Sequence, residues 1–428
     1  MQAIILSIGD ELVLGQTVDT NSAYLSGKLA ELGIGTVYHA TVADDQDAIA
    51  RAILRAAKDA NLVLISGGLG PTEDDLTRQA LAQAMGVGLV EHAESIKAIE
   101  QRMMRAGRTM PPRNRVQALH PEGSNVIENT CGTAPGIHAR IGDAEIFVTP
   151  GVPKELYVMF ERSILPRLDP QQATRQVILT TKVNTFGLGE SAVAERLGDL
   201  ADRNRNPVVG TTVSQATVAV RIRSEFEDGS DARRQLDDTI RAVEHRLGAL
   251  VFGRDDTTIQ QSLVSLLAER GLIMATAESC TGGLIGKMVT DVPGSSDVYH
   301  GGWVTYSYAA KSHQLGVPEA LLQQHGAVCE PVAEAMATGA LERSGADLAL
   351  AITGIAGPGG GSEAKPVGTV WIALADRTSG DAPHVMAVRF VLPGDRESVR
   401  QRSAKCALQM ARFHLLGISL DELHFGRR

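Results

Sequence analysis

Two side chains that could act as nucleophiles, Ser279 and Cys280, stand next to each other in the segment AESCTGG. The apolar run of residues 271–275 before them predicts a buried strand, and a helix is expected to begin near Thr281. At such a turn the first backbone N–H groups of the helix point outward, which suits a developing oxyanion. A serine in this position is also a common helix cap, so the turn by itself does not identify a nucleophile.

A serine hydroxyl needs a base to accept its proton, and the nearest candidates are Tyr306 and Lys311 in the segment YSYAAK. Burial lowers the pKa of a lysine, so a desolvated Lys311 would be neutral and able to take the proton, with Tyr306 as a relay. The alternatives are a lysine on the surface and a tyrosine packed in the core. The expected chemistry is nucleophilic attack on a carbonyl carbon, with Ser279 as the attacking group.

Six blocks follow in order between residue 258 and about residue 416, namely AESCTGG, PGSS, YSYAAK, HGAV, ITGIAGPGGGSEAKPVGTVW and PGDRESVR. In these blocks the chain resembles the C-terminal domain of the CinA family. The resemblance implies an amidohydrolase that converts nicotinamide mononucleotide to nicotinic acid mononucleotide and ammonia without a metal or other cofactor. Its catalytic residues would be Ser279, Lys311 and Tyr306. Tyr308 and Cys329 depart from the family pattern, which has Asn and Ser there, and both could reshape the pocket.

The phosphate of such a nucleotide needs cations and backbone amides around it. Arg396 and Arg400 are four residues apart and therefore share one face of a helix, although they could equally form a solvated face. The glycine loop of residues 354–361 offers N–H groups. The residues expected to bind the nucleotide are Thr281, Gly282, Thr353, Gly354, Gly357, Lys365, Arg396 and Arg400.

A second group of chemically active residues lies near the N-terminus, where acidic side chains follow apolar runs. An apolar run at residues 3–8 predicts a buried parallel strand, further strands are expected at residues 35–42 and 62–66, and helices are expected at residues 20–32 and 47–60. This alternation predicts a doubly wound parallel sheet with its ligand site at the carboxyl ends of the strands. The carboxylates expected at that edge are Asp10, Glu11, Asp44, Asp45, Asp74 and Asp75.

The glycine-rich segment GGLGPT precedes the last two of these carboxylates. Glycines allow the backbone to approach a phosphate, and carboxylates beside a phosphate predict a divalent metal ion (Mg, Mn or Co) that bridges protein and pyrophosphate oxygens. The simpler alternative is that each aspartate caps a helix. The residues expected to bind substrate here are Asn21, Gly67, Gly68, Gly70 and Thr72.

The blocks GDELVLGQTVDTNS, GGLGPTEDDLT, CGTAPG and TPGVPKE, with Asn114 and Gln117, resemble the molybdopterin-binding (MoaB/MogA-like) fold in its CinA N-terminal version. The resemblance implies a metal-dependent pyrophosphatase that splits ADP-ribose into AMP and ribose 5-phosphate, in which Asp44, Asp45 and Asp75 match family carboxylates. The same fold serves cofactor assembly elsewhere, so a molybdopterin-binding protein stays open. A nucleotide-binding or partner-docking protein with one or both sites inactive is another alternative.

We expect three α/β or α+β domains: residues 1–170, MoaB/MogA-like; residues 171–253, a small KH-like module; and residues 254–428, the amidohydrolase domain. RNA-binding KH domains carry a GxxG loop with basic flanks. The corresponding loop here has Glu190 beside it and no basic flank. We therefore interpret the module as structural, as a spacer or a dimer contact, and expect a homodimer.

The composition restricts the partners that the protein is expected to have. The 428 residues include 43% hydrophobic and 21% charged residues, with a net charge of −9 and a pI near 5.7. This balance argues against general binding to nucleic acid or to a membrane surface, since both require a basic face. The four cysteines are scattered without a CxxC pair, and no signal or membrane-spanning segment is evident, so we expect a cytoplasmic protein with reduced thiols.

Overall fold

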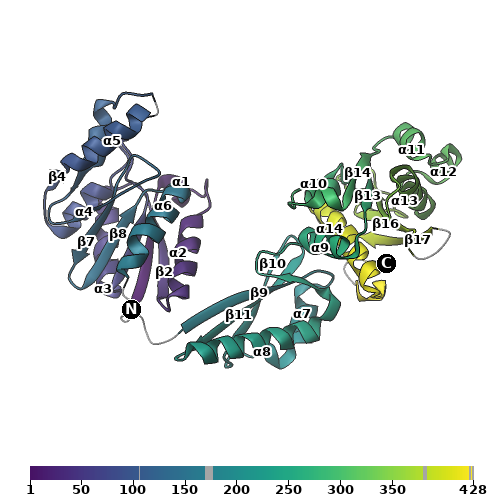
Figure 1. The fold of residues 1–428 in the computed structure, drawn as a ribbon, viewed down its shortest axis with the longest axis horizontal. Coiled ribbons are helices and arrows are strands. Elements are labelled where there is room, and N and C mark those ends of the chain that lie inside the picture. The colour runs from purple at the N-terminus through teal and green to yellow at the C-terminus, as the bar shows by residue number, and fades with distance from the viewer. Residues whose placement is uncertain (106, 169–176, 379–382, 424–425, 427–428) are drawn as a thin grey trace. The chain divides into compact units, whose positions relative to one another are not determined.

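The computed structural model describes residues 1–105, 107–168, 177–378, 383–423 and 426 (Figure 1). The chain divides into two compact units, one of residues 1–179 with 224–233 and the other of residues 180–223 with 234–428. Over the described ranges, none of the helices combines the length and the apolar character needed to cross a lipid bilayer.

The first unit is built on a six-stranded sheet with the order β2-β1-β3-β8-β7-β6. The strands β2, β1, β3 and β8 run parallel, whereas β7 is antiparallel to both of its neighbours, β8 and β6. The doubly wound fold is confirmed, with an antiparallel edge that the alternation of strands and helices did not predict. The strands are β1 (Gln2–Ile8), β2 (Gly35–Val42), β3 (Leu62–Ser66), β6 (Asn125–Ile127), β7 (Gly136–Ile141) and β8 (Ala144–Thr149).

Helices cover both faces of this sheet, which explains why β3 is buried along its whole length. The amphipathic helix α3 buries Ile49 and Ile53 against one face, while Leu25 and Leu29 of α2 pack on the other. The central strands are therefore exposed to solvent only at their ends, and the polar residues that follow neighbouring strands lie close together there. The helices are α1 (Asp10–Val13), α2 (Thr20–Glu31), α3 (Gln46–Asp59), α4 (Thr77–Met85), α5 (Ala93–Arg105) and α6 (Pro153–Met159). A short ribbon of β4 (Leu89–Glu91) and β5 (Leu119–Pro121) lies beside them.

The middle of the chain forms a four-stranded sheet with the order β10-β11-β9-β12. A two-residue turn at Gln215 and Ala216 joins β10 to β11, and both residues have positive φ angles, 47° and 61°. Such a turn matches the twist of the strands that it connects. The elements are β9 (Val177–Thr185), α7 (Glu190–Leu197), β10 (Val208–Ser214), β11 (Thr217–Phe226), α8 (Gly229–Leu247) and β12 (Val251–Arg254).

The C-terminal part contains a five-stranded sheet with the order β14-β13-β15-β16-β17. The first three strands are parallel, and β16 is antiparallel to both of its neighbours, β15 and β17. The strands are β13 (Met274–Glu278), β14 (Tyr299–Val304), β15 (Leu348–Gly354), β16 (Thr369–Asp376) and β17 (His384–Val391). The helices are α9 (Ile259–Arg270), α10 (Leu284–Thr290), α11 (Tyr308–Leu315), α12 (Glu319–His325), α13 (Glu330–Ser344) and α14 (Arg396–Leu416).

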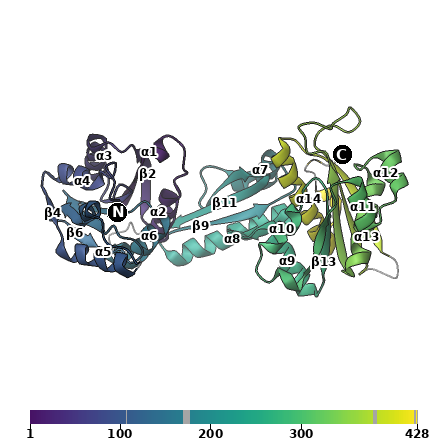
Figure 2. The same cartoon turned by 90° about the horizontal axis from the view of Figure 1, so that it is seen from above.

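This sheet lies between two layers of helices, with α13 on one side and α9 and α14 on the other (Figures 1 and 2). The alanine-rich α13 packs closely because its small side chains and Met336 meet alanines of β13, β15 and β16. The strand before Ser279 begins three residues later than predicted, at Met274, and ends at Glu278. The following helix begins at Leu284 instead of near Thr281, so a five-residue turn carries Ser279.

The long helix α14 also holds the middle module. Lys405 donates from Nζ to the carbonyl oxygen of Gln215 at 2.9 Å, at the turn between β10 and β11. Gln409 donates to the carbonyl oxygen of Phe186 at 3.1 Å, and Arg412 donates to that of Val251 at 3.1 Å. The same helix thus begins in the C-terminal domain and contacts three segments of the middle module.

Candidate functional sites

Ser279 and Lys311 come together at the carboxyl end of the C-terminal sheet. Lys311 Nζ donates to Ser279 Oγ at 2.9 Å and to the carbonyl oxygen of Thr305 at 2.6 Å. The lysine is fully buried at 0% exposure, and Ser279 retains 8%. The serine oxygen therefore lies at hydrogen-bond distance from an amine whose surroundings contain little water, which is the geometry of a nucleophile beside its base.

Burial lowers the pKa of Lys311 to about 8, because an ammonium group loses its hydration there, while the charge that Cys280 carries when ionised acts in the opposite direction. At pH 7 such an amine is neutral for roughly a tenth of the time. Burial also raises the pKa of Cys280 to about 12. The cysteine thus stays a protonated thiol at neutral pH and is a poor rival nucleophile.

Glu278, which the sequence analysis missed, organises the turn that carries the serine. Its buried carboxylate accepts hydrogen bonds from the backbone N–H groups of Gly283 at 3.1 Å, Ile285 at 3.0 Å and Gly286 at 2.9 Å. The expectation that the start of the helix faces an oxyanion is therefore wrong for these amides, since the carboxylate takes them. The N–H groups of Cys280 and Thr281 are not among them and stay the candidates. The sequence feature that could have identified Glu278 is its position as a carboxylate at the end of a largely apolar strand.

Tyr306 does not make the expected contact with Lys311. Its side chain is 62% exposed, and its hydroxyl accepts a hydrogen bond of 3.0 Å from Arg396. The other terminal nitrogen of Arg396 donates to the carbonyl oxygen of Gly357 at 2.8 Å. Tyr306, Arg396 and the glycine loop therefore form one network at the open side of the site, which suits substrate contact better than proton relay.

The second predicted arginine also lies close to the serine. Arg400 donates to the carbonyl oxygen of Thr281 at 2.9 Å and forms an ion pair with Glu397. The neighbouring Gly282 has a positive φ of 63°, a backbone conformation that favours glycine. The hydroxyl of Thr281 is buried and has no hydrogen-bond partner among the described residues, so it can serve a bound ligand.

The remaining predicted nucleotide contacts are less direct. The buried Thr353 donates from Oγ1 to the carbonyl oxygen of Ala327 at 2.8 Å, so its hydroxyl braces the fold. Lys365 donates to the carbonyl oxygen of His325 at 2.9 Å. A side chain at Gly354 would press on Val370, which gives that glycine a packing role. Of this group, Gly357 alone is tied to the arginine network.

The N-terminal candidates surround a cavity of about 350 Å³ at the carboxyl ends of β1 and β3. The residues predicted from sequence that line it are Glu11, Asp44, Gly67, Gly68, Gly70, Thr72, Asp74 and Asp75. Gln117 and Glu155 line it as well and were not among the predicted site residues. Asn21 lies at the same edge, where its Nδ2 donates to Ser66 Oγ at 2.9 Å and to the carbonyl oxygen of Gly151 at 2.8 Å.

The six predicted metal ligands do not form one ligand set. Asp75 accepts the N–H groups of Gly70 at 2.6 Å and Thr72 at 2.9 Å, and it therefore braces the glycine loop. Asp45 accepts the N–H group of Ala48 at 2.7 Å and caps α3. Over the part of the chain that the structure describes, no group of three or more His, Cys, Asp or Glu side chains could hold a metal ion.

Asp10 and Asp44 are linked reciprocally: each carboxylate accepts the backbone N–H group of the other, at 3.1 Å and 2.9 Å. Burial, with repulsion from Asp10, Glu11 and Asp74, raises the pKa of Asp44. A cation would relieve this repulsion. The donor set fits an ion such as Mg²⁺ that takes one or two carboxylates and completes its shell with water and substrate oxygens, but it does not fit a cage made by protein alone.

A buried arginine supports the glycine loop from below. Arg78 is 1% exposed and donates to the carbonyl oxygens of Leu69 and Gly70. A Cβ atom at Gly68 would collide with Thr77 Oγ1, so this glycine permits a close approach of loop and helix. The guanidinium group of Arg78 therefore fixes the loop through two of its carbonyl oxygens and places a positive charge next to it. The sequence analysis did not single out Arg78.

Three family models match the chain: "Probable molybdopterin binding domain" over residues 4–170, "Damage-inducible protein CinA KH domain" over 180–253, and "CinA C-terminal domain" over 256–415. A CinA-like protein of Geobacter metallireducens is 42% identical over 97% of this chain and 100% of its own length. A CinA-like protein of Gemmatimonas aurantiaca is 41% identical over 96% of each chain.

A solved structure, that of the competence/damage inducible protein CihA from Agrobacterium tumefaciens, is 42% identical to the matched part of this chain. The match covers 36% of this chain and 90% of that one, with a TM-score of 0.34.

Proposed function

The chain belongs to the CinA family, and we propose that its C-terminal domain hydrolyses the carboxamide of nicotinamide mononucleotide to nicotinic acid mononucleotide and ammonia. The observation that carries this proposal is the 2.9 Å hydrogen bond between Lys311 Nζ and Ser279 Oγ, formed by a fully buried lysine. A serine with a neutral amine beside it is suited to acyl transfer at neutral to mildly alkaline pH.

In the proposed reaction, Ser279 Oγ attacks the carboxamide carbon while its proton passes to Lys311 Nζ. The oxygen of the tetrahedral intermediate is held by the N–H groups of Cys280 and Thr281. The C–N bond then breaks, Lys311 returns the proton to the leaving nitrogen, and ammonia departs. Water attacks the resulting ester and gives a proton to Lys311. Lys311 passes this proton to Ser279 Oγ as the ester bond breaks, which restores the serine and releases the carboxylate product.

The arginines explain how the phosphate of the substrate would be placed. Arg396 and Arg400 lie in the first turns of α14, and each already donates to a loop of the site, at Gly357 and Thr281. A guanidinium group has five N–H donors, so both side chains keep donors for phosphate oxygens. Tyr306 extends this surface, since its hydroxyl is bound to Arg396.

An ammonia assay tests the proposal directly. We expect the wild-type chain to release ammonia from nicotinamide mononucleotide and Ser279→Ala to lose this activity by at least about a thousandfold. Ser307→Ala is a matched control, because this serine caps α11 and lies outside the hydrogen bonds of Ser279. Equal ammonia release by Ser279→Ala and the wild type would exclude Ser279 as the nucleophile.

For the N-terminal domain, we propose hydrolysis of ADP-ribose to AMP and ribose 5-phosphate with the help of a divalent metal ion. The supporting observation is the cavity in which the glycine loop faces Asp44, Asp74 and Glu155. The ion would supply positive charge at the pyrophosphate. Asp44 is the expected ligand, because burial and the neighbouring carboxylates raise its pKa and a cation would offset both effects. Full activity in excess chelator would exclude this role.

Two other functions make different predictions. A binding protein without catalysis would bind both nucleotides in calorimetry and release neither ammonia nor ribose 5-phosphate. A molybdopterin-binding protein is suggested by the description of the family model for residues 4–170 and would carry pterin through purification. Fluorescence of the purified chain after oxidation would detect that pterin.

A further inference from the structure

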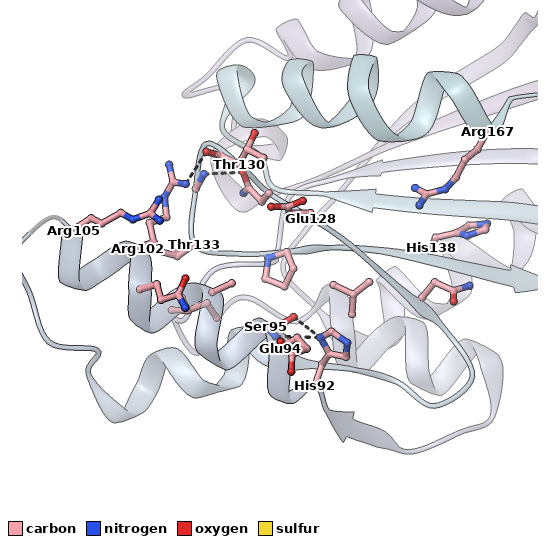
Figure 3. Close-up of a pocket in the computed structure, with 18 residues that line it drawn as sticks. His92, Glu94, Ser95, Arg102, Arg105, Glu128, Thr130, Thr133, His138 and Arg167 are labelled. Atoms are coloured by element: carbon pink, nitrogen blue, oxygen red, sulfur yellow. Dashed lines mark hydrogen bonds between the residues drawn. The ribbon is translucent and has the colours of Figure 1, made fainter.

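A large groove in the first unit lies apart from the two sites described above. It runs between α5 and the loop of residues 128–135, has a volume of about 980 Å³, and is shown in Figure 3. Pockets for small organic ligands measure about 300–1,000 Å³, so the groove is large enough for a nucleotide. Both charged and apolar side chains line it, which is the composition of a ligand site.

One end of the groove carries two cations. Arg102 and Arg105, in the last turn of α5, lie together there in Figure 3. Arg102 donates from one terminal nitrogen to the carbonyl oxygen of Thr130 at 2.7 Å, across the groove, and this bond fixes its guanidinium group. Neither arginine forms an ion pair with an acidic side chain among the described residues. Paired guanidinium groups without a carboxylate partner are suited to bidentate binding of a phosphate.

The rest of the groove matches the other parts of a nucleotide. Glu128 projects into it between the two ends in Figure 3, and a carboxylate in such a place accepts hydrogen bonds from ribose hydroxyls. Ala98, Val126 and Pro135 supply apolar surface. At the opposite end lie Arg167 and His138, whose ring stacks on Phe147 with the centroids 4.5 Å apart.

A tightly held wall separates this groove from the glycine-loop cavity. Asn129 Oδ1 accepts the N–H groups of Cys131 at 2.9 Å and Gly132 at 2.7 Å, and its Nδ2 donates to Glu155 at 2.6 Å. Thr133 in this wall lines both cavities. The two spaces are therefore neighbours, and each has its own charged groups: carboxylates in the cavity and arginines at the end of the groove.

We propose that the groove is a separate binding site for a mononucleotide, whose 5′-phosphate lies between Arg102 and Arg105 and whose ribose hydroxyls meet Glu128. The base would occupy the apolar part of the groove. AMP and nicotinamide mononucleotide both contain a ribose 5′-phosphate and are the two candidate ligands to compare. Neither of the reactions proposed above is required for this binding, although AMP is a product of the N-terminal one.

Calorimetry on the full chain in the presence of a chelator tests the site with AMP, nicotinamide mononucleotide and ribose 5-phosphate as probes. We expect saturable binding of AMP that weakens about tenfold or more in Arg105→Gln. The side chain of Arg105 forms no hydrogen bond among the described residues, so Arg105→Gln should leave the fold intact, and an unchanged melting temperature checks this. Arg102→Gln should weaken binding as well, and Glu128→Gln should weaken AMP but not 2′,3′-dideoxy-AMP.

The controls are Asp44→Asn in the glycine-loop cavity and Ser279→Ala in the C-terminal site, both of which should bind AMP like the wild type. Binding that is lost in either control and kept in Arg105→Gln would overturn the proposal, as would the absence of AMP binding at millimolar concentration. Equal affinity for ribose 5-phosphate and AMP would show that the base does not bind in the apolar part of the groove. Failure of ADP-ribose hydrolysis would leave this binding unchanged, so the two proposals fail separately.

Discussion

Lys311 lies 32 residues beyond Ser279 in the chain, yet its Nζ donates to the serine oxygen at 2.9 Å. The register of two parallel strands explains this proximity. Glu278 pairs with Val304 at the ends of β13 and β14, and the N–H group of Thr305 donates to the carbonyl oxygen of Glu278 at 2.8 Å. The segments that follow β13 and β14 therefore leave the sheet side by side. Helix α11 begins shortly after β14 and places the side chain of Lys311 against Ser279.

The activity of the C-terminal site should increase with pH until Lys311 is neutral. Because burial lowers the pKa of Lys311 to about 8, kcat/KM for nicotinamide mononucleotide should rise about tenfold per pH unit below that value and level off above it. Lys311→Arg should be inactive across the range, since a guanidinium group does not lose its proton. Ammonia release at a series of pH values checks both points, and a flat profile would contradict the role of the lysine.

Stability should also reveal the buried lysine. The pKa of Lys311 falls from 10.5 to about 8 on folding, so between these values the unfolded chain binds more protons and the folded state gains stability as pH rises. Relative to Lys311→Met, the wild type should gain about 3 kcal/mol between pH 7 and pH 10.5. Urea unfolding at several pH values measures this difference. A constant difference would show that the lysine is not desolvated.

Glu278→Gln should slow the reaction without changing its pH dependence. The carboxylate holds three backbone N–H groups that follow Ser279, and an amide group has one oxygen with which to replace two. We expect a loss of about 1–3 kcal/mol in unfolding free energy and a reduced kcat with little change in KM. Steady-state kinetics and urea unfolding check this. A raised KM with unchanged kcat would assign Glu278 to substrate binding instead.

Arg396→Gln should weaken the binding of substrates that carry a phosphate. Loss of a charge-assisted hydrogen bond to phosphate should raise KM for nicotinamide mononucleotide by about ten- to a hundredfold. Nicotinamide riboside, which lacks the phosphate, should be hydrolysed equally by variant and wild type. Arg402→Gln is the matched control, since Arg402 is on the same helix and donates to the carbonyl oxygen of Pro393. An equal effect on both substrates would point to the network with Tyr306.

Asp44→Asn should stabilise the chain in the absence of divalent ions. Burial and neighbouring carboxylates raise the pKa of Asp44, so its charge costs folding free energy at every pH above that pKa, and stability falls as pH rises through it. Mg²⁺ should raise the melting temperature of the wild type and have a smaller effect on the variant. Thermal unfolding with and without the ion decides this. An equal response of both proteins would exclude Asp44 as a ligand.

The sequence predicted strand ends well where a buried apolar run stops at polar residues, as in β3; β2 is an edge strand of partly buried and exposed residues and was located without such a run. Gly35–Val42 and Leu62–Ser66 were located to the residue, and the position of Ser279 after a strand follows from the same pattern. The contact of Lys311 with the serine was predicted from a family motif.

Side-chain roles at the strand ends were harder to predict. Asp44, Asp45 and Asp75 have the same chemistry, and only the course of the backbone decides which of them caps a helix, braces a loop or faces the cavity. Tyr306 was assigned to the lysine because of its closeness in sequence, whereas its hydroxyl meets Arg396, 90 residues away. Long-range partners of this kind depend on tertiary packing, which local patterns do not contain.

The helix α14 contacts the serine turn through Arg400 near its start and the middle module through Lys405, Gln409 and Arg412 further along. An α-helix of its 21 residues is about 30 Å long and resists bending. A ligand that moves the hairpin turn at Gln215 would therefore also move Arg400 and the turn that carries Ser279. Binding at this surface, away from the nucleotide, would then slow the reaction proposed at Ser279.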